Sequence, residues 1–209
     1  MLTRSVLIRR LAAALLAVSL AAPARAQVAP QEAADFIQRA GVQLATTIGG
    51  AGSVDEKRRR IAPFMAEVVD VEGVARFVLG RFWRLATPEQ QRTYVGLFNQ
   101  VLANSIAGRL GEYRGAEAVK VTVGRPDPRP EGVLVPTTIV RPNNQPVNVT
   151  WLVTEAGGKP KVADVIAEGM SLRLAQRSDY SAYIQRNNND VGALIRALEV
   201  QVSQGAGLR

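Results

Sequence analysis

The stretch from residue 147 to residue 167, VNVTWLVTEAGGKPKVADVIA, decides the fold. Its first half carries apolar side chains at every second position, which predicts a strand with one buried face. These side chains are Val147, Val149, Trp151 and Val153. Gly157-Gly158 predicts a tight turn, and the run from Lys161 to Ala167 predicts a second strand. Because the connection is so short, the two strands must be antiparallel.

Two further strands are predicted upstream. Val119 to Val123 alternates valine with polar residues, and Val133 to Val140 is rich in β-branched residues. The prolines of the segment from Arg125 to Pro130 predict a turn between them. Pro136 has no N–H to donate to a neighbouring strand, which favours an edge position or a bulge. The four strands and their short connections predict an antiparallel meander.

Amphipathic helices are predicted in the segments that precede and follow the strands along the chain, because apolar residues there recur at spacings of three and four. Capping residues indicate where three of them begin: Ser53 with Glu56, Asp70, and Thr87 with Gln90. The predicted helices cover residues 31–48, a segment opened by Ser53, and residues 70–79, 87–109, 171–185 and 190–202. The order predicts an α+β fold in one domain, residues 27–209. Its four-stranded antiparallel sheet is covered on one face by the helices, with an apolar cavity between them.

Residues 1–26 are predicted to be a secretory signal peptide and not part of the fold. Arg4, Arg9 and Arg10 precede an apolar run, and Ala24-Arg25-Ala26 offers the small residues of a cleavage site. The whole chain of 209 residues has 26 basic and 18 acidic side chains. The leader holds four of the bases and no acid, so its removal lowers the net charge from +8 to +4. That balance gives no reason to expect nucleic-acid binding, and the leader predicts a periplasmic protein.

Candidate chemistry is sparse. The chain has no cysteine and no histidine, which excludes thiol nucleophiles and a serine–histidine–acid triad. Asp164 and Glu168 would share one face of the last strand if that strand is regular, and two carboxylates could do acid–base work. The alternative is that they pair with Arg173 or Arg177, or cap the following helix. Ser171 stands where that helix begins and is predicted to be its N-cap.

Two blocks of sequence resemble a known family. Leu79-Gly80-Arg81-Phe82-Trp83-Arg84 with Ala86-Thr87-Pro88-Glu89-Gln90 is similar to the "LGRYWR…ASPEQ" signature of the MlaC family. Lys161-Val162-Ala163-Asp164-Val165, Glu168-Gly169-Met170-Ser171-Leu172 and Arg177-Ser178 resemble that family's "KVYDV…EGVSL…YRS" block. Ala163 and Pro160 depart from it, since the family often has an aromatic residue and a tryptophan there. We expect Arg81 and Trp83 to be structural, with Arg81 paired to a carboxylate and Trp83 packed beneath the junction of sheet and helices.

The resemblance implies a carrier that moves phospholipid between an outer-membrane lipoprotein complex and an inner-membrane ABC transporter with an MCE-domain protein. Such a carrier maintains outer-membrane lipid asymmetry, acts as a monomer and needs no cofactor or metal, since the phospholipid is its cargo. A related branch of the family is associated with hopanoids. Two alternatives remain: a periplasmic enzyme that uses Asp164 or Glu168, and a chaperone with an apolar groove. We expect acyl chains to lie between one sheet face and the stripe of the long helix. The expected contacts are Phe98, Val101, Leu102, Ile106, Val147, Val149 and Trp151.

Overall fold

The computed structural model describes residues 28–49, 53–111, 120–140 and 145–207. In this part of the chain the helices are α1 (Pro30–Gly49), α2 (Val54–Val68), α3 (Val71–Leu79), the 3-10 helix η1 (Gly80–Arg84), α4 (Pro88–Gly111), α5 (Leu172–Arg186) and α6 (Val191–Ser203). The strands are β1 (Lys120–Val123), β2 (Asp127–Arg129), β3 (Gly132–Val140), β4 (Val147–Ala156), β5 (Lys159–Ala167) and β6 (Met170–Ser171). The α+β prediction is confirmed. The predicted signal peptide lies outside the described residues.

The sheet is antiparallel throughout, with the strand order β1-β3-β4-β5-β6 and with β2 paired to β3. It therefore has more strands than the predicted meander. The segment predicted as a turn contains β2, in which Pro128 pairs with Val133. A proline is tolerated there because β2 is an edge strand and loses no hydrogen bond on its outer side.

Pro136 lies in a central strand, so its predicted edge position is wrong. Its neighbours on one side are β1, which ends opposite Thr137, and β2, which begins opposite Leu134. Between these two strands only the Gly124 amide reaches β3, and it donates to the Pro136 carbonyl over 2.8 Å. The missing N–H of Pro136 thus falls where the neighbouring strand is interrupted.

A β-bulge in β5 changes which residues face the helices. Leu152 pairs with Asp164 but Val153 pairs with Val162, so Ala163 is an extra residue in β5. In a regular strand Val162 and Val165, three residues apart, would lie on opposite faces. The bulge places both on the face that carries Val153, and it leaves Asp164 on the other face.

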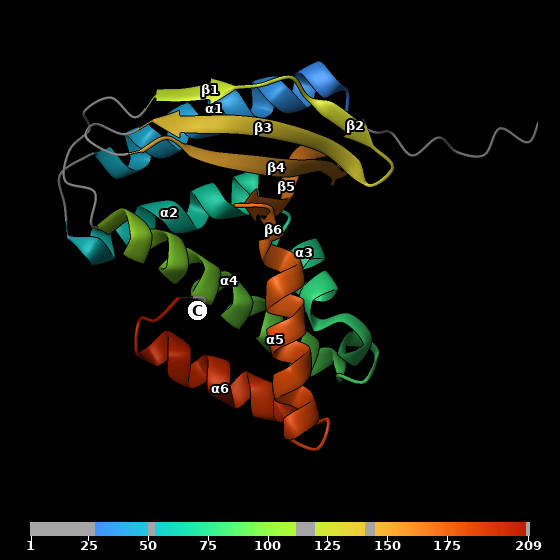
Figure 1. Cartoon of the computed structure of the whole chain (residues 1–209). Coiled ribbons are helices and arrows are strands. Elements are labelled where there is room, and N and C mark those ends of the chain that lie inside the picture. Colours follow the sequence, from blue (N-terminus) through green and yellow to red (C-terminus); the bar gives the residue numbers. More distant parts are fainter. Residues whose placement is uncertain (1–27, 50–52, 112–119, 141–144, 208–209) are drawn as a thin grey trace, which may run out of the picture.

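The helix starts follow the predicted capping. Ser53 and Glu56 form the expected capping box, Thr87 and Gln90 form another, and Asp70 accepts a hydrogen bond from the Gly73 amide. Figure 1 shows α1 running along the strands, while α3, α4, α5 and α6 form a separate layer of helices. α1 and α2 cover one sheet face, as the sequence predicts, because their buried side chains pack with Val133, Val135 and Val153.

Candidate functional site

Two apolar clusters divide the interior. The sheet cluster joins α1, α2 and one face of the sheet. Its buried members are Val28, Ala33, Ala34, Ile37, Ala40, Ile61, Phe64, Met65, Val68, Ala107, Val133, Val135, Val153 and Val162. The helical cluster joins α3, η1, α4, α5 and α6. Its buried members are Ala75, Val78, Leu79, Phe82, Ala86, Tyr94, Phe98, Val101, Tyr180, Ile184, Val191, Leu194, Ile195 and Leu198.

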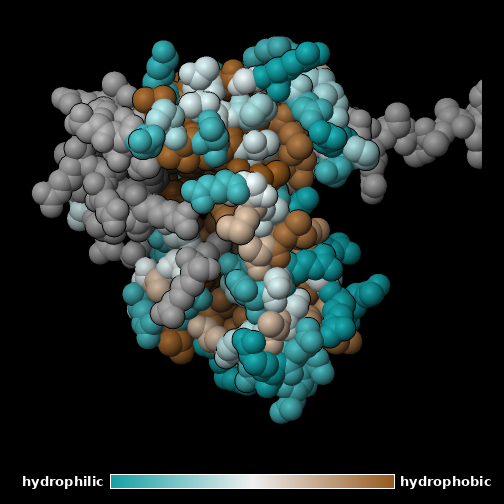
Figure 2. Space-filling model, in the orientation of Figure 1, coloured by the Kyte–Doolittle hydropathy of each residue, from teal (hydrophilic) through white to brown (hydrophobic). Residues whose placement is uncertain are grey.

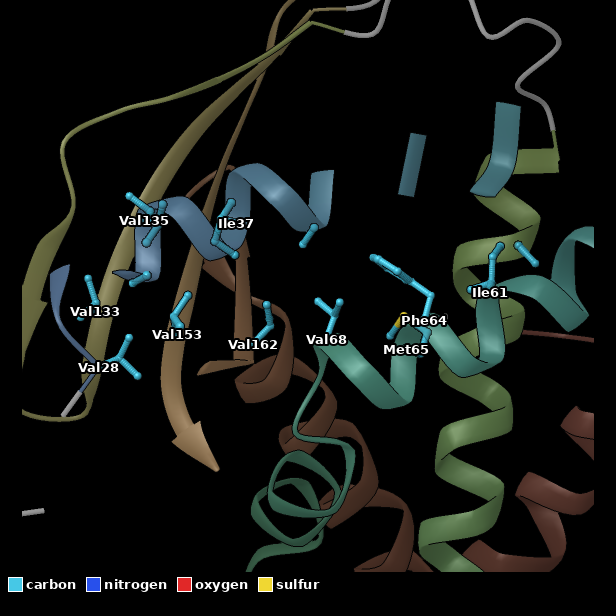
Figure 3. Packing of buried hydrophobic residues seen from close by; sticks show 14 residues of the cluster. Val28, Ile37, Ile61, Phe64, Met65, Val68, Val133, Val135, Val153 and Val162 are labelled. Carbon is cyan, nitrogen blue, oxygen red and sulfur yellow. The ribbon is translucent and has the colours of Figure 1, made fainter. Parts of the chain in front are cut away.

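The sheet cluster lies between the sheet and the helices, which is where the sequence predicts the lipid site. Figure 3 shows Phe64 and Val68 of α2 pointing toward the strands that carry Val153 and Val162. Ile37 of α1 approaches the same strands from another side (Figure 3). Figure 2 shows apolar side chains between the sheet layer and the helical layer. This cluster offers a continuous apolar environment bounded by two helices and a sheet.

Three of the predicted contacts meet at the sheet cluster. Leu102 and Ile106 of α4 and Trp151 of β4 are half-buried and pack against it. The Trp151 indole N–H donates to Oγ1 of Thr137 over 2.9 Å, and that hydroxyl donates to the Val149 carbonyl over 2.9 Å. The buried polar atoms are thus satisfied, and the indole presents its apolar face to the cluster.

Val147 and Val149 lie on the same sheet face as Trp151. Their cross-strand partners are Ile139 and Thr137, in the alternating register that the sequence predicts. Both valines are half-buried. They extend the apolar face of β4 toward its N-terminal end, beyond the buried members of the sheet cluster.

Phe98 and Val101 are placed differently from the prediction. Their exposed fractions are 2% and 0%, and both belong to the helical cluster. The Phe98 ring lies 5.9 Å from that of Tyr94, whose hydroxyl donates to the Ala75 carbonyl of α3. Burial raises the pKa of Tyr94, so the hydroxyl stays protonated and remains a donor. The apolar stripe of α4 therefore serves two clusters, and Leu102 packs against both.

The predicted contacts include no residue of α1 or α2, the helices that enclose the other side of the sheet cluster. Phe64 and Met65 of α2 and Ile37 of α1 are buried members of the sheet cluster. Their amphipathic spacing was visible in the sequence, and a helix with one apolar stripe must bury it. The sequence alone did not indicate that these stripes, and not the N-terminal half of the α4 stripe, would face the sheet.

Asp164 and Glu168 do not form the pair that acid–base chemistry would need. Asp164 is 7% exposed, and its carboxylate accepts hydrogen bonds from the Ser171 hydroxyl and from the amides of Val165 and Arg173. Nε of Arg173 lies 3.4 Å from Oδ2 of the same carboxylate. Glu168 follows the end of β5 in an exposed turn, with φ at 51°. The predicted shared face is wrong, and the alternative of ion pairing and helix capping is confirmed for Asp164.

Arg81 and Trp83 also differ from their predicted contacts. Arg81 is exposed and its guanidinium lies 4.9 Å from the centre of the Phe82 ring, with no ion pair to a carboxylate among the described residues. Trp83 is half-buried and packs against the helical cluster instead of the sheet. Its carbonyl accepts a hydrogen bond from the Gln91 side chain. Both residues lie in η1, away from the sheet cluster.

A hollow of about 360 Å³ adjoins the sheet cluster at Val69. It opens at the junction of α2, α3, α4 and β5, and its lining includes Asn99 and Lys161. The Lys161 ammonium donates to the carbonyls of Ala66 and Glu67 at the end of α2, which fixes this helix against β5. No group of residues in the described part of the chain could hold a metal ion.

Comparisons with known proteins agree with this architecture. The family model for MlaC protein matches residues 42–200, which include both signature blocks. The toluene tolerance protein ttg2D of Pseudomonas putida is 26% identical over 132 residues, which are 63% of this chain and 60% of that relative. The match thus spans less than two thirds of the relative's length.

A solved structure has the same fold. It is that of a phospholipid-binding protein from Ralstonia solanacearum in complex with a phospholipid, with a TM-score of 0.73. The likeness covers 83% of this chain and 98% of the other, at 23% sequence identity. Within the ranges described here, none of the helices has the length and hydropathy needed to cross a membrane.

Proposed function

The chain belongs to the MlaC family, and we propose that it is a periplasmic carrier that binds phospholipid in the sheet cluster. The observation that carries the proposal is the position of that cluster, an apolar layer enclosed by α1, α2 and one face of the sheet. The proposal is further supported by the phospholipid in the Ralstonia solanacearum protein, which shares the fold. The enzyme alternative loses its main support, because both carboxylate oxygens of Asp164 already accept hydrogen bonds from Val165, Ser171 and Arg173 of the fold itself.

We place the acyl chains against the half-buried margin of the sheet cluster. Trp151 from the sheet and Leu102 and Ile106 from α4 are apolar and remain partly accessible there. Val147 and Val149 prolong the same face of β4. The headgroup stays at the mouth of the site, because a buried phosphate without partners would cost more than the apolar contacts return.

Energetics require that other proteins impose the direction of transfer. Burying about 30 methylenes of a diacyl lipid is worth about 24 kcal/mol relative to water, at ~0.8 kcal/mol each. A bilayer offers almost the same environment, so transfer between bilayer and carrier is nearly balanced. From the resemblance to the MlaC family we propose that the partners are an outer-membrane lipoprotein complex and an inner-membrane ABC transporter with an MCE-domain protein. The ATPase of the transporter would supply the energy. Residues 1–26 would direct export.

Lipid extraction and mass analysis of protein purified from bacterial cells test the proposal. We expect a diacyl phospholipid that stays bound through purification. A hopanoid in its place would assign the protein to the other branch of the family. Protein that carries no lipid, and that takes up none from phospholipid vesicles, would refute the carrier function.

A further inference from the structure

A second hollow, of about 510 Å³, lies on the helical layer and is lined by arginines. It is formed by α3, η1 and α5, and we call it the arginine hollow. Its lining includes Arg76, Phe77, Arg81, Trp83, Arg84 and Arg177. The lining contains four guanidinium groups and no carboxylate. Figure 2 shows strongly hydrophilic side chains on the side of the molecule where α3 lies.

Three of these four guanidinium groups, those of Arg76, Arg81 and Arg177, lie over aromatic rings. Arg76 lies 5.8 Å from the centre of the Trp83 ring, and Arg177 lies 4.9 Å from that of Phe77. The ion pairs between described residues involve Arg129, Arg173 and Arg196, and none of the four lining arginines. Ring contacts thus orient three of the four guanidinium groups, and no ion pair between described residues neutralises any of the four. Arginines ordered in this way lose little conformational entropy when they bind an oxyanion.

Exposed leucines stand beside the arginines. Leu85 directly follows Arg84 and is 66% exposed. Leu174 precedes Arg177 by three residues on α5, so the two are neighbours on the helix surface, and Leu174 is 56% exposed. Singly exposed leucines are common on protein surfaces, but beside four cations they give this surface both polar and apolar parts.

We propose that the arginine hollow and its two neighbouring leucines dock the protein on the anionic surface of a phospholipid membrane. Basic side chains with adjacent aliphatic ones are the combination that lets a protein lie at a bilayer surface, with guanidinium groups at the phosphates and leucines at the acyl boundary. An acidic protein segment could match the four cations but would leave the leucines without an apolar partner. Membrane docking is an addition to the carrier function and does not depend on which lipid is carried.

The position of the hollow is compatible with a loaded carrier. Its walls belong to the helical layer, whereas the proposed lipid site lies between the sheet, α1 and α2. A membrane bound at the hollow would therefore not occupy the acyl site. The unpaired arginines would hold the protein near a bilayer while cargo is exchanged through protein partners.

Flotation of the purified protein with vesicles tests the proposal. Vesicles that contain phosphatidylglycerol should bind the protein at low ionic strength, neutral phosphatidylcholine vesicles should not, and high salt should release it. The double variant Arg81→Gln/Arg84→Gln should bind anionic vesicles about 30-fold more weakly, from the usual contribution of a basic side chain at such a surface. Leu85→Ser should weaken binding without changing the charge.

The matched control removes the same charge elsewhere. Arg39 of α1 and Arg125, between β1 and β2, are both exposed. Arg39→Gln/Arg125→Gln should therefore bind anionic vesicles almost as the unchanged protein does. Equal losses in the two double variants would mean that only net charge matters, and the proposal would be wrong.

Two further outcomes would also overturn it. One is equal binding to neutral and anionic vesicles. The other is an Arg81→Gln/Arg84→Gln variant that binds vesicles normally but no longer associates with membrane proteins, since the hollow would then dock protein. Circular dichroism should show that every variant is folded. The extracted lipid load should be unchanged in all of them, so failure of membrane docking is distinguishable from failure of the carrier function.

Discussion

Replacement of Asp164 tests whether this carboxylate holds the fold together. It lies in β5 and connects three elements, because it accepts hydrogen bonds from its own strand, from Ser171 of β6 and from the first turn of α5. Ser171 in turn accepts a hydrogen bond from the Leu174 amide and caps α5. Asp164→Ala removes the acceptor for all of these donors and leaves the Arg173 guanidinium without its carboxylate partner.

The expected cost follows from these contacts. A hydrogen bond to a charged group contributes about 1.5–3 kcal/mol, and removal of one partner of a buried ion pair costs about 3–5 kcal/mol. Arg173 keeps some access to water, since its side chain is 22% exposed, which favours the lower part of that range. We expect Asp164→Ala to lower the free energy of unfolding by about 3–4 kcal/mol. Asp164→Asn keeps one acceptor oxygen and should cost less.

Urea unfolding followed by circular dichroism measures this change, and Asp127→Ala is the matched control. Asp127 also pairs with an arginine, Arg129, but its side chain is 50% exposed. Loss of an exposed pair costs less than about 1 kcal/mol. If Asp164→Ala were as stable as the control, the structural role assigned to Asp164 would be wrong, and acid–base chemistry would again need consideration.

Three other substitutions give separate expectations. Val149→Trp should displace lipid and lower the free energy of unfolding by about 1–3 kcal/mol through overpacking. The control Thr150→Trp, on the opposite face of β4, should keep its lipid. Equal lipid loads of the two variants in mass analysis would place the acyl site elsewhere. Trp83→Ala should lower the free energy of unfolding in urea by about 1–3 kcal/mol, which is less than truncation of a fully buried aromatic side chain costs, because Trp83 is half-buried. A larger loss of stability would contradict this placement of Trp83. The hydrogen bonds from Arg196 and from the Gly192 amide lower the pKa of Asp190. The ionised Asp190 carboxylate therefore stabilises the fold above its pKa in the unfolded chain, and this stabilisation is lost as the pH falls through its pKa in the folded protein. Arg196→Gln should raise the pKa of Asp190 toward its ordinary value in an NMR titration, and an unchanged value would show that the ion pair is not formed in solution.

Local signals in the sequence were sufficient for the helices and most strands. Ser53, Asp70, Thr87 and Ser171 were predicted as caps, and each accepts the expected hydrogen bond in the structure. Such caps depend on residues within three positions, so one stretch of sequence contains all the information. The alternation in β4 likewise gave the face shared by Val149 and Trp151.

The features that the sequence did not reveal depend on contacts between distant segments. The bulge at Ala163 cannot be read from the alternation of β5, because it is defined by the register against β4. Its consequence for the site is large, since it turns Val162 and Val165 to one face and Asp164 to the other. The prolines of residues 125–130 predict a turn and not the short strand β2, although an edge position in a sheet tolerates proline.

The division of α4 between two clusters explains why only part of its predicted stripe faces the sheet. A helical stripe shows which residues are buried but not what they are buried against. Up to Val101, the apolar residues Tyr94, Phe98 and Val101 of α4 face the other helices of their layer, and the helical cluster buries them almost completely. From Leu102 onward the same helix reaches the sheet cluster, where Ile106 is only half-buried. The half-buried end of the stripe, and not its fully buried centre, is therefore the part that can give apolar contacts to a ligand.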